Sequence, residues 1–115
     1  MTVVSDTPLA HRAIARPRVH VTRQLLPAVE ERMRELFDVT LNASDTPQSR
    51  EALLAAVQDC DVLVPTVTDR IDAELIAAAG DQLGLIASFG AGYEHVDLHA
   101  ARSRKIVVTN TPGVF

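Results

Sequence analysis

The sequence is poor in aromatic residues and in net positive charge. Phe, Tyr and Trp together make up only 3% of its 115 residues, so its core must be built from Leu, Val, Ile and Ala. So few aromatic rings also argue against the stacking platforms that bind single-stranded nucleic acid. The net charge of −4 disfavours polyanionic partners. We therefore expect no nucleic-acid partner.

Cysteine and long apolar runs are scarce as well. Cys60 is the single cysteine, which excludes a disulfide within the chain and is typical of a reducing compartment. It lies between Asp59 and Asp61, whose negative charges raise a thiol pKa and argue against a nucleophile. The longest apolar run, residues 52–57, is far shorter than the ~20 residues that cross a bilayer. We expect a cytoplasmic protein with no membrane partner, in which residues 1–16 form a disordered arm.

Two kinds of apolar pattern alternate along the rest of the chain. β-branched or continuous apolar stretches predict strands at residues 18–22, 38–41, 62–64, 83–88 and 106–108. Helical spacing fills the gaps between them, with Pro27 opening the first helix and Thr46 capping the second. Asp72 and Asp97 are candidate N-caps of the next two, and Gly80 suits a left-handed stop. The alternation predicts an α/β fold, a flavodoxin-like doubly wound parallel sheet of about five strands with helices on both faces.

In sheets of this kind, ligands bind beyond the carboxyl ends of the strands. Two loops at that edge have suggestive residues, namely residues 65–69 after the third strand and Phe89-Gly90-Ala91-Gly92 after the fourth. The glycines allow successive backbone N–H groups to turn toward one point, where a carboxylate or phosphate would accept their hydrogen bonds. They could equally do no more than permit a tight turn. The residues alone leave both interpretations open.

A nucleotide site and a metal site are both poorly supported. A dinucleotide fingerprint needs a third glycine where this chain has His95, and an acidic residue about 20 positions further on, where it has residues 111–113. His95 and His99 are four residues apart, but Asp97 as an N-cap places His95 outside the helix. We therefore expect this chain to bind neither a metal ion nor a nucleotide cofactor by itself.

Three motifs occur in a definite order and spacing: Thr-Asp-Arg-Ile-Asp at 68–72, Phe-Gly-Ala-Gly-Tyr-Glu-His-Val-Asp at 89–97 and Val-Thr-Asn-Thr-Pro-Gly-Val at 108–114. Together they resemble the D-isomer-specific 2-hydroxyacid dehydrogenases, most of all the glyoxylate/hydroxypyruvate reductase branch. The resemblance begins at Arg18 and continues to the end of the sequence. It implies that residues 17–115 belong to a flavodoxin-like substrate-binding domain, which in this family is joined to a separate NAD(P)-binding Rossmann domain.

The resemblance also implies which residues bind the substrate. In the family, backbone amides of the Gly-x-Gly loop hold the substrate carboxylate, which by position are those of Ala91 and Gly92, with Phe89 and Gly90 in the same loop. The loop after the third strand lines the same pocket, which implies Thr66 and Val67. The family's catalytic Arg, Glu and His, and its nucleotide loop, match no position here, so no catalytic residue is assigned.

The implied activity is the NAD(P)-dependent reduction of 2-oxo acids such as glyoxylate or hydroxypyruvate to D-2-hydroxy acids, with a homodimer as an option for the full-length enzyme. We expect this chain to be the amino-terminal portion of such an enzyme and to be inactive alone. The alternative is a stand-alone module that binds a small carboxylate or a protein partner. A reading frame beyond codon 115 with a glycine-rich loop and a later His would favour the first hypothesis.

The last predicted helix ends in a basic cluster of Arg102, Arg104 and Lys105. Cations there suit the negative end of the helix dipole. Relatives usually have glycine where this chain has Lys105. If the left-handed helix cap is kept, lysine at this position costs up to ~1 kcal/mol.

Overall fold

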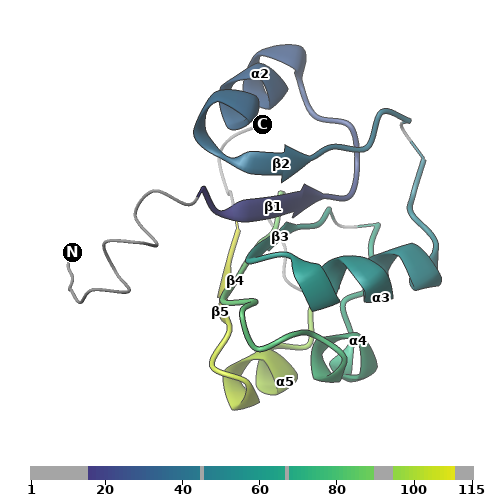
Figure 1. Cartoon of the computed structure of the whole chain (residues 1–115). Helices are drawn as coiled ribbons and strands as arrows, with labels where there is room; N and C mark the ends of the chain where they lie inside the picture. The colour runs from purple at the N-terminus through teal and green to yellow at the C-terminus, as the bar shows by residue number, and fades with distance from the viewer. Residues whose placement is uncertain (1–15, 45, 67, 90–94, 111–115) are drawn as a thin grey trace, which may run out of the picture.

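The computed structural model describes residues 16–44, 46–66, 68–89 and 95–110, in which short strands alternate with helices (Figure 1). The strands of this part are β1 (Arg18–Val21), β2 (Asp38–Thr40), β3 (Val62–Val64), β4 (Leu85–Ala87) and β5 (Val107–Thr109). Its helices are α2 (Pro27–Leu36), α3 (Arg50–Asp59), α4 (Ala73–Ala77) and α5 (Leu98–Ser103). All the predicted strands and helices are therefore present, with their ends shifted.

The described strands form one parallel sheet in the order β2-β1-β3-β4-β5. Val19 of β1 lies opposite Val39 of β2 on one side and Val62 of β3 on the other. The chain moves outward from β1 to β2 and then returns past β1 to β3, so the direction of winding reverses between β1 and β3. This is the predicted flavodoxin-like order, in which ligands bind outside the carboxyl ends of the strands at the reversal.

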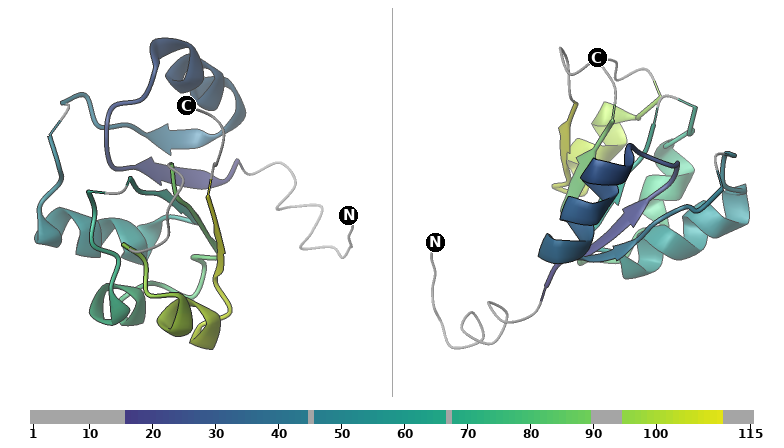
Figure 2. Two further views of the ribbon diagram at one scale, coloured as in Figure 1. Left: turned by 180° about the vertical axis from the view of Figure 1, so that it is seen from behind. Right: turned by 90° about the horizontal axis from the view of Figure 1, so that it is seen from above.

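Helices cover both faces of the sheet, but unequally (Figure 2). α3, α4 and α5 pack on one face, over an aliphatic cluster that includes the fully buried Leu63 and Ile86. α2 packs on the other face against β1 and β2, where Met33 is half-buried. That face is incompletely covered at its far edge, since Val107 of β5 is 59% exposed.

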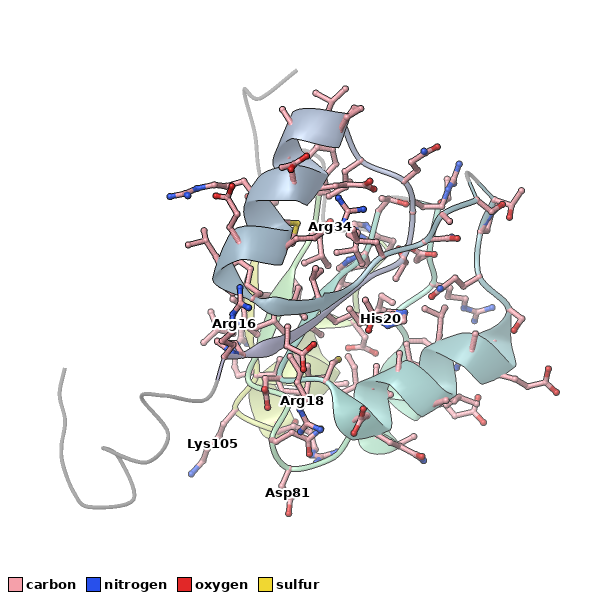
Figure 3. The ribbon with its side chains drawn as sticks, turned by 45° about the horizontal axis from the view of Figure 1, so that its top comes forward. Arg16, Arg18, His20, Arg34, Asp81 and Lys105 are labelled. Atoms are coloured by element: carbon pink, nitrogen blue, oxygen red, sulfur yellow. The ribbon has the colours of Figure 1, made fainter. Side chains whose placement is uncertain are left out.

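Arg16 is the first of the described residues. Its guanidinium donates hydrogen bonds to the carbonyl oxygens of Arg34 (2.8 Å) and Glu35, at the end of α2 (Figure 3). A cation there suits the negative end of the helix dipole. The remainder of the expected arm, residues 1–15, lies outside the described residues.

Two predicted helix caps are confirmed. The side chain of Asp72 accepts a hydrogen bond from the N–H of Leu75 (3.0 Å) at the start of α4. The side chain of Asp97 accepts one from the N–H of Ala100 (2.9 Å) at the start of α5. Each bond satisfies a donor in the first turn that has no partner within its helix.

Two other predicted helix ends are wrong. α3 is capped by Ser49, whose hydroxyl accepts from the N–H of Ala52 (3.1 Å), and not by Thr46. Thr46 instead lies in the preceding turn. Gly80 does not adopt the left-handed conformation. Glycine is needed there because a Cβ would lie 2.8 Å from the carbonyl oxygen of Gln58, so the close approach of α3 explains the residue.

The basic end of α5 keeps the left-handed cap that was a condition of the sequence-based prediction. Lys105 has φ 61°, the region that favours glycine. The N–H of Lys105 bonds to the carbonyl oxygen of Arg102 (3.0 Å), and that of Ile106 to the carbonyl oxygen of Ala101 (2.9 Å). This pair of bonds is the Schellman motif, with lysine at the position that glycine usually takes.

The side chain of Arg104 forms hydrogen bonds with a neighbouring helix, α4. Its guanidinium donates to the carbonyl oxygens of Ile76 (2.8 Å) and Ala79 (3.1 Å), at the carboxyl end of α4. It also pairs with Asp81 at 3.2 Å. The sequence predicts that these cations favour the carboxyl end of their own helix, whereas the guanidinium of Arg104 bonds at the carboxyl end of α4.

Candidate functional site

The carboxyl ends of β1, β3 and β4 are joined to one another beyond the strands themselves. Thr22 donates its N–H to the carbonyl oxygen of Val64 (3.2 Å), and Phe89 donates its own to that of Pro65 (2.8 Å). Thr66 and Phe89 form a further parallel bridge. Because the winding of the sheet reverses between β1 and β3, this edge is the place where the fold offers a ligand site.

The predicted substrate-binding residues divide between this edge and segments that are not described. Thr66 and Phe89 are brought together by the bridge, and both are half-buried. Phe89 also packs against the apolar cluster beneath α2. Val67 and residues 90–92, the Gly-Ala-Gly segment, lie outside the described residues. The structure thus places the start of the predicted glycine loop beside the loop that follows β3.

The described residues on either side of positions 90–94 are held by hydrogen bonds. Before these positions, the buried hydroxyl of Ser88 lies 2.7 Å from Nε2 of His95, which follows them. The carbonyl oxygen of His95 accepts the N–H of Ile71 (2.8 Å), and the N–H of Asp97 donates to the carbonyl oxygen of Ile71 (2.9 Å). The residues that flank positions 90–94 are therefore fixed to each other and to the chain before α4.

A buried carboxylate organises the neighbouring loop. Asp69 is only 3% exposed, and its Oδ2 accepts the hydroxyl of the fully buried Thr22. The same oxygen accepts the N–H of Thr66 at 2.9 Å, with the hydroxyl of Thr66 at 3.4 Å. The N–H of Asp69 in turn donates to the carbonyl oxygen of Thr66 (3.0 Å). These bonds close the loop after β3 into a turn and tie it to the end of β1.

A cation lies at the same edge. Arg23 follows Thr22 directly, and its guanidinium donates to the hydroxyl of Thr68 at 2.9 Å. Thr68 is also 3.0 Å from the hydroxyl of Thr66. A chain of hydroxyl groups thus runs from the guanidinium to the predicted substrate-binding Thr66.

Sequence reasoning did not single out Thr22, Arg23 or Ser88 as site residues, and gave Asp69 only as part of a loop. A signal was available, because each of them follows or ends a predicted strand that belongs to the same sheet edge. Polar residues at such positions in β1, β3 and β4 meet once the strand order is known. The sequence pattern alone does not give that strand order, so it could not show that these residues meet.

Two hollows lie beside this edge, and neither suits an anion. One, of about 420 Å³, is lined by residues 68–72 and 95–97, which carry three carboxylates, those of Asp69, Asp72 and Asp97, and a single arginine. The other, of about 410 Å³, contains Arg50, but this guanidinium is paired with Asp72 at 2.5 Å. Neither of these hollows is therefore a good candidate site for a small acid.

The described residues contain no metal-binding cluster and no membrane-spanning helix. They include no group of three or more His, Cys, Asp and Glu side chains able to hold a metal ion. His95 precedes α5, as predicted from the Asp97 cap, whereas His99 lies exposed on that helix. None of the helices in the described ranges is long and apolar enough to cross a bilayer.

Cys60 is not placed for chemistry. It is 5% exposed at the end of α3, and burial raises the pKa of its thiol to about 11. The neighbouring carboxylates of Asp61 and Asp59 act in the same direction, but burial is the larger cause. The predicted rise is confirmed, while its main physical reason differs from the one that the sequence suggested.

This fold and this edge correspond to a known class of oxidoreductase domain. Residues 14–115 match the family described as D-isomer specific 2-hydroxyacid dehydrogenase, catalytic domain, and the chain belongs to that family. It is 40% identical over 100 residues to the glyoxylate reductase of Korarchaeum cryptofilum, covering 87% of this chain and 30% of that protein. It is 42% identical over 103 residues to the glyoxylate reductase of Thermofilum pendens, covering 89% and 30%.

Solved structures share the fold over the same region. The crystal structure of a D-isomer specific 2-hydroxyacid dehydrogenase, NAD-binding, from a Polaromonas species superimposes with a TM-score of 0.80 at 35% identity, covering 85% of this chain and 31% of that one. The TT0316 protein from Thermus thermophilus gives 0.71 at 44% identity, covering 84% and 31%. The chain therefore spans about 30% of the length of the curated relatives that it matches.

Proposed function

We propose that this chain supplies substrate-binding elements of an NAD(P)-dependent oxidoreductase that reduces 2-oxo acids such as glyoxylate or hydroxypyruvate to D-2-hydroxy acids. The observation that carries the proposal is the joining of the loops after β3 and β4 through the Thr66–Phe89 bridge, at the edge where the winding of the sheet reverses. Family membership supports the class of reaction. The naming of the relatives as glyoxylate reductases supports the kind of acid.

Within that function, the chain's part is to bind and orient the acid. The amides of Ala91 and Gly92 would donate to the substrate carboxylate, with Gly90 permitting the turn and Phe89, Thr66 and Val67 bordering the pocket. Charge-assisted bonds from fixed amides hold a carboxylate without a mobile cationic side chain. Holding the 2-oxo group in one orientation lowers the entropic part of the reaction barrier. The hydrogen bonds at both ends of the loop support this role, since they limit its freedom at Phe89 and His95.

We infer that the described residues of this chain do not hold the nicotinamide cofactor. The glycine that a dinucleotide fingerprint requires is replaced by His95, whose ring is 2.7 Å from the hydroxyl of Ser88. The cofactor would supply the hydride in the complete enzyme, and we assign no residue here to its binding. We accordingly expect the 115-residue chain alone to bind acids and to turn none over.

Amide chemical shifts of the isotopically labelled chain test this proposal. Titration with glycolate or oxalate should shift the amides of residues 66 and 89–95 in a saturable way. Ethylene glycol, which resembles glycolate but has no carboxylate, is the matched control and should shift none of them. Ala91→Pro removes one of the two amide donors and should weaken binding of both acids.

Two results would contradict the proposal. Shifts that spread over the surface, or equal shifts with ethylene glycol, would show that the loop is no carboxylate site. Oxidation of NADH or NADPH by the purified chain with glyoxylate, above the rate in buffer, would overturn the expected inactivity.

A further inference from the structure

The buried carboxylate of Asp69 is the polar group at the ligand edge that the proposed function does not use. The residue is 3% exposed, and three donors from two loops converge on its Oδ2. Among the described residues, no lysine or arginine forms an ion pair with it. Burying a carboxylate is costly unless donors satisfy it, so a residue of this kind calls for a specific role.

The contacts of Asp69 link the three strand ends of the site. The hydroxyl of Thr22 connects the carboxylate to β1. The N–H of Thr66 connects it to the chain after β3, at 2.9 Å. Thr66 is bridged in turn to Phe89, the residue that begins the predicted glycine loop. A displacement of this carboxylate would therefore be transmitted through Thr66 to the base of the loop.

We propose that Asp69 is a positioning residue for the substrate acid, holding Thr66 and, through the Thr66–Phe89 bridge, the base of the glycine loop in the geometry that binds a carboxylate. This inference rests on the proposed function, because it concerns the affinity of the same loop. It adds a residue that neither touches the acid nor carries a charge of the right sign to attract it.

The sign of that charge makes the inference testable. A carboxylate at the binding edge repels an anionic ligand, so through-space electrostatics alone predicts that removing its charge tightens binding. A positioning role predicts the reverse, because the neutral amide oxygen of asparagine accepts the hydrogen bonds of Thr22 and Thr66 more weakly than the carboxylate does, so the base of the loop is held less firmly. The two explanations of Asp69 therefore give opposite changes in the dissociation constant for the same substitution.

The experiment measures the dissociation constant of oxalate by amide-shift titration of the 115-residue chain. Asp69→Asn keeps the shape of the side chain and removes its charge. We expect it to raise the dissociation constant about tenfold, or about 1.4 kcal/mol. Thr22→Val, which removes one donor to the carboxylate with little change of shape, should weaken binding in the same direction. Thr22→Ser retains the hydroxyl and should restore affinity to within about twofold of the unsubstituted chain.

A purely structural role for Asp69 would lower stability without changing the affinity of the folded protein. Unfolding in urea is therefore measured for each variant, and binding is compared at temperatures where all of them are folded. If Asp69→Asn does not fold, the comparison of Thr22→Val with Thr22→Ser carries the test, because valine and threonine have nearly the same volume. Rescue by serine of affinity, and not only of stability, is the expected result.

The outcomes separate this inference from the proposed function. If the unsubstituted chain binds oxalate and Asp69→Asn binds it equally well or more tightly, Asp69 does not position the loop, and the proposed function stands. Equal weakening by Thr22→Val and Thr22→Ser would also overturn the inference. If the unsubstituted chain shows no saturable shifts at residues 66 and 89–95, the proposed function fails and this inference fails with it.

Discussion

Replacing Lys105 by glycine should stabilise the fold. Lys105 occupies the left-handed position of a Schellman motif, with φ 61°. Holding a residue that has a Cβ in this region costs about 1–2 kcal/mol. Glycine avoids that cost but loses about 0.5–1 kcal/mol more in backbone entropy on folding. The balance for Lys105→Gly ranges from about 0 to about 1.5 kcal/mol and is centred on a gain of about 0.75 kcal/mol in the free energy of unfolding.

Urea unfolding followed by circular dichroism measures this gain. With an m-value of about 1–1.5 kcal/mol/M, the midpoint should rise by about 0.5 M at an unchanged slope. The melting temperature should rise by about 2–4 °C. Lys105→Ala is the matched control, because it removes the same ammonium group and retains the Cβ. We expect it to fall slightly below the original chain, since a cation near the last carbonyls of a helix is favourable.

Equal stabilisation by alanine and glycine would refute the reasoning, since the source would then be the ammonium group and not the backbone conformation. Binding gives a second check. Lys105 precedes β5, at the amino end of the sheet, and its side chain extends away from the body of the molecule (Figure 3). The candidate site lies at the opposite, carboxyl edge. The dissociation constant of oxalate should therefore not change in Lys105→Gly.

Three further substitutions or treatments have definite expected outcomes. Ser88→Ala removes the hydroxyl that holds His95 across the base of the glycine loop, and should cost about 1 kcal/mol in stability and weaken oxalate binding in the amide-shift titration. An unchanged dissociation constant would show that this bond does not hold the loop. Asp72→Asn keeps an N-cap oxygen but loses the charge that pairs with Arg50, and should lower the free energy of unfolding by less than about 1 kcal/mol. Asp72→Ala loses the cap as well and should lower it by about 1–2 kcal/mol, as measured by urea unfolding. The hydrogen bond from Arg50 lowers the pKa of Asp72 below its ordinary value of 3.8. The stability that the Asp72 carboxylate contributes is therefore complete above pH 3.8 and declines as the pH falls through the lowered pKa. The difference in stability between the original chain and Asp72→Ala should shrink over the same pH interval. Cys60 should react slowly with iodoacetamide at pH 8 in the native protein and rapidly in urea, because burial raises its thiol pKa to about 11; rapid labelling of the folded chain would contradict this.

The features that the sequence predicted correctly depend on residues close together in the chain. Asp72 and Asp97 each cap a helix by accepting an N–H only three residues ahead, so the local sequence contains both partners. Ser49 and Thr46 are two good caps three residues apart, and local sequence does not decide between them. In the structure, the side chain of Asn42 donates a hydrogen bond to the carbonyl oxygen of Thr46 (2.9 Å). This bond holds Thr46 in the turn before α3, so that Ser49 caps the helix.

The contacts that tie the candidate site to the end of β1 join residues remote in sequence. Thr22 and Asp69 are 47 positions apart, and their side chains meet because β1 and β3 are neighbours in the sheet. The alternating pattern of strands and helices predicts that the carboxyl ends share one edge, which suffices to find the loops but not their partners. Had the strands followed their sequence order, β2 would separate β1 from β3, and Thr22 could not reach the carboxylate of Asp69. The reversal of winding that makes this edge a binding place is therefore also what brings the end of β1 next to the loop after β3.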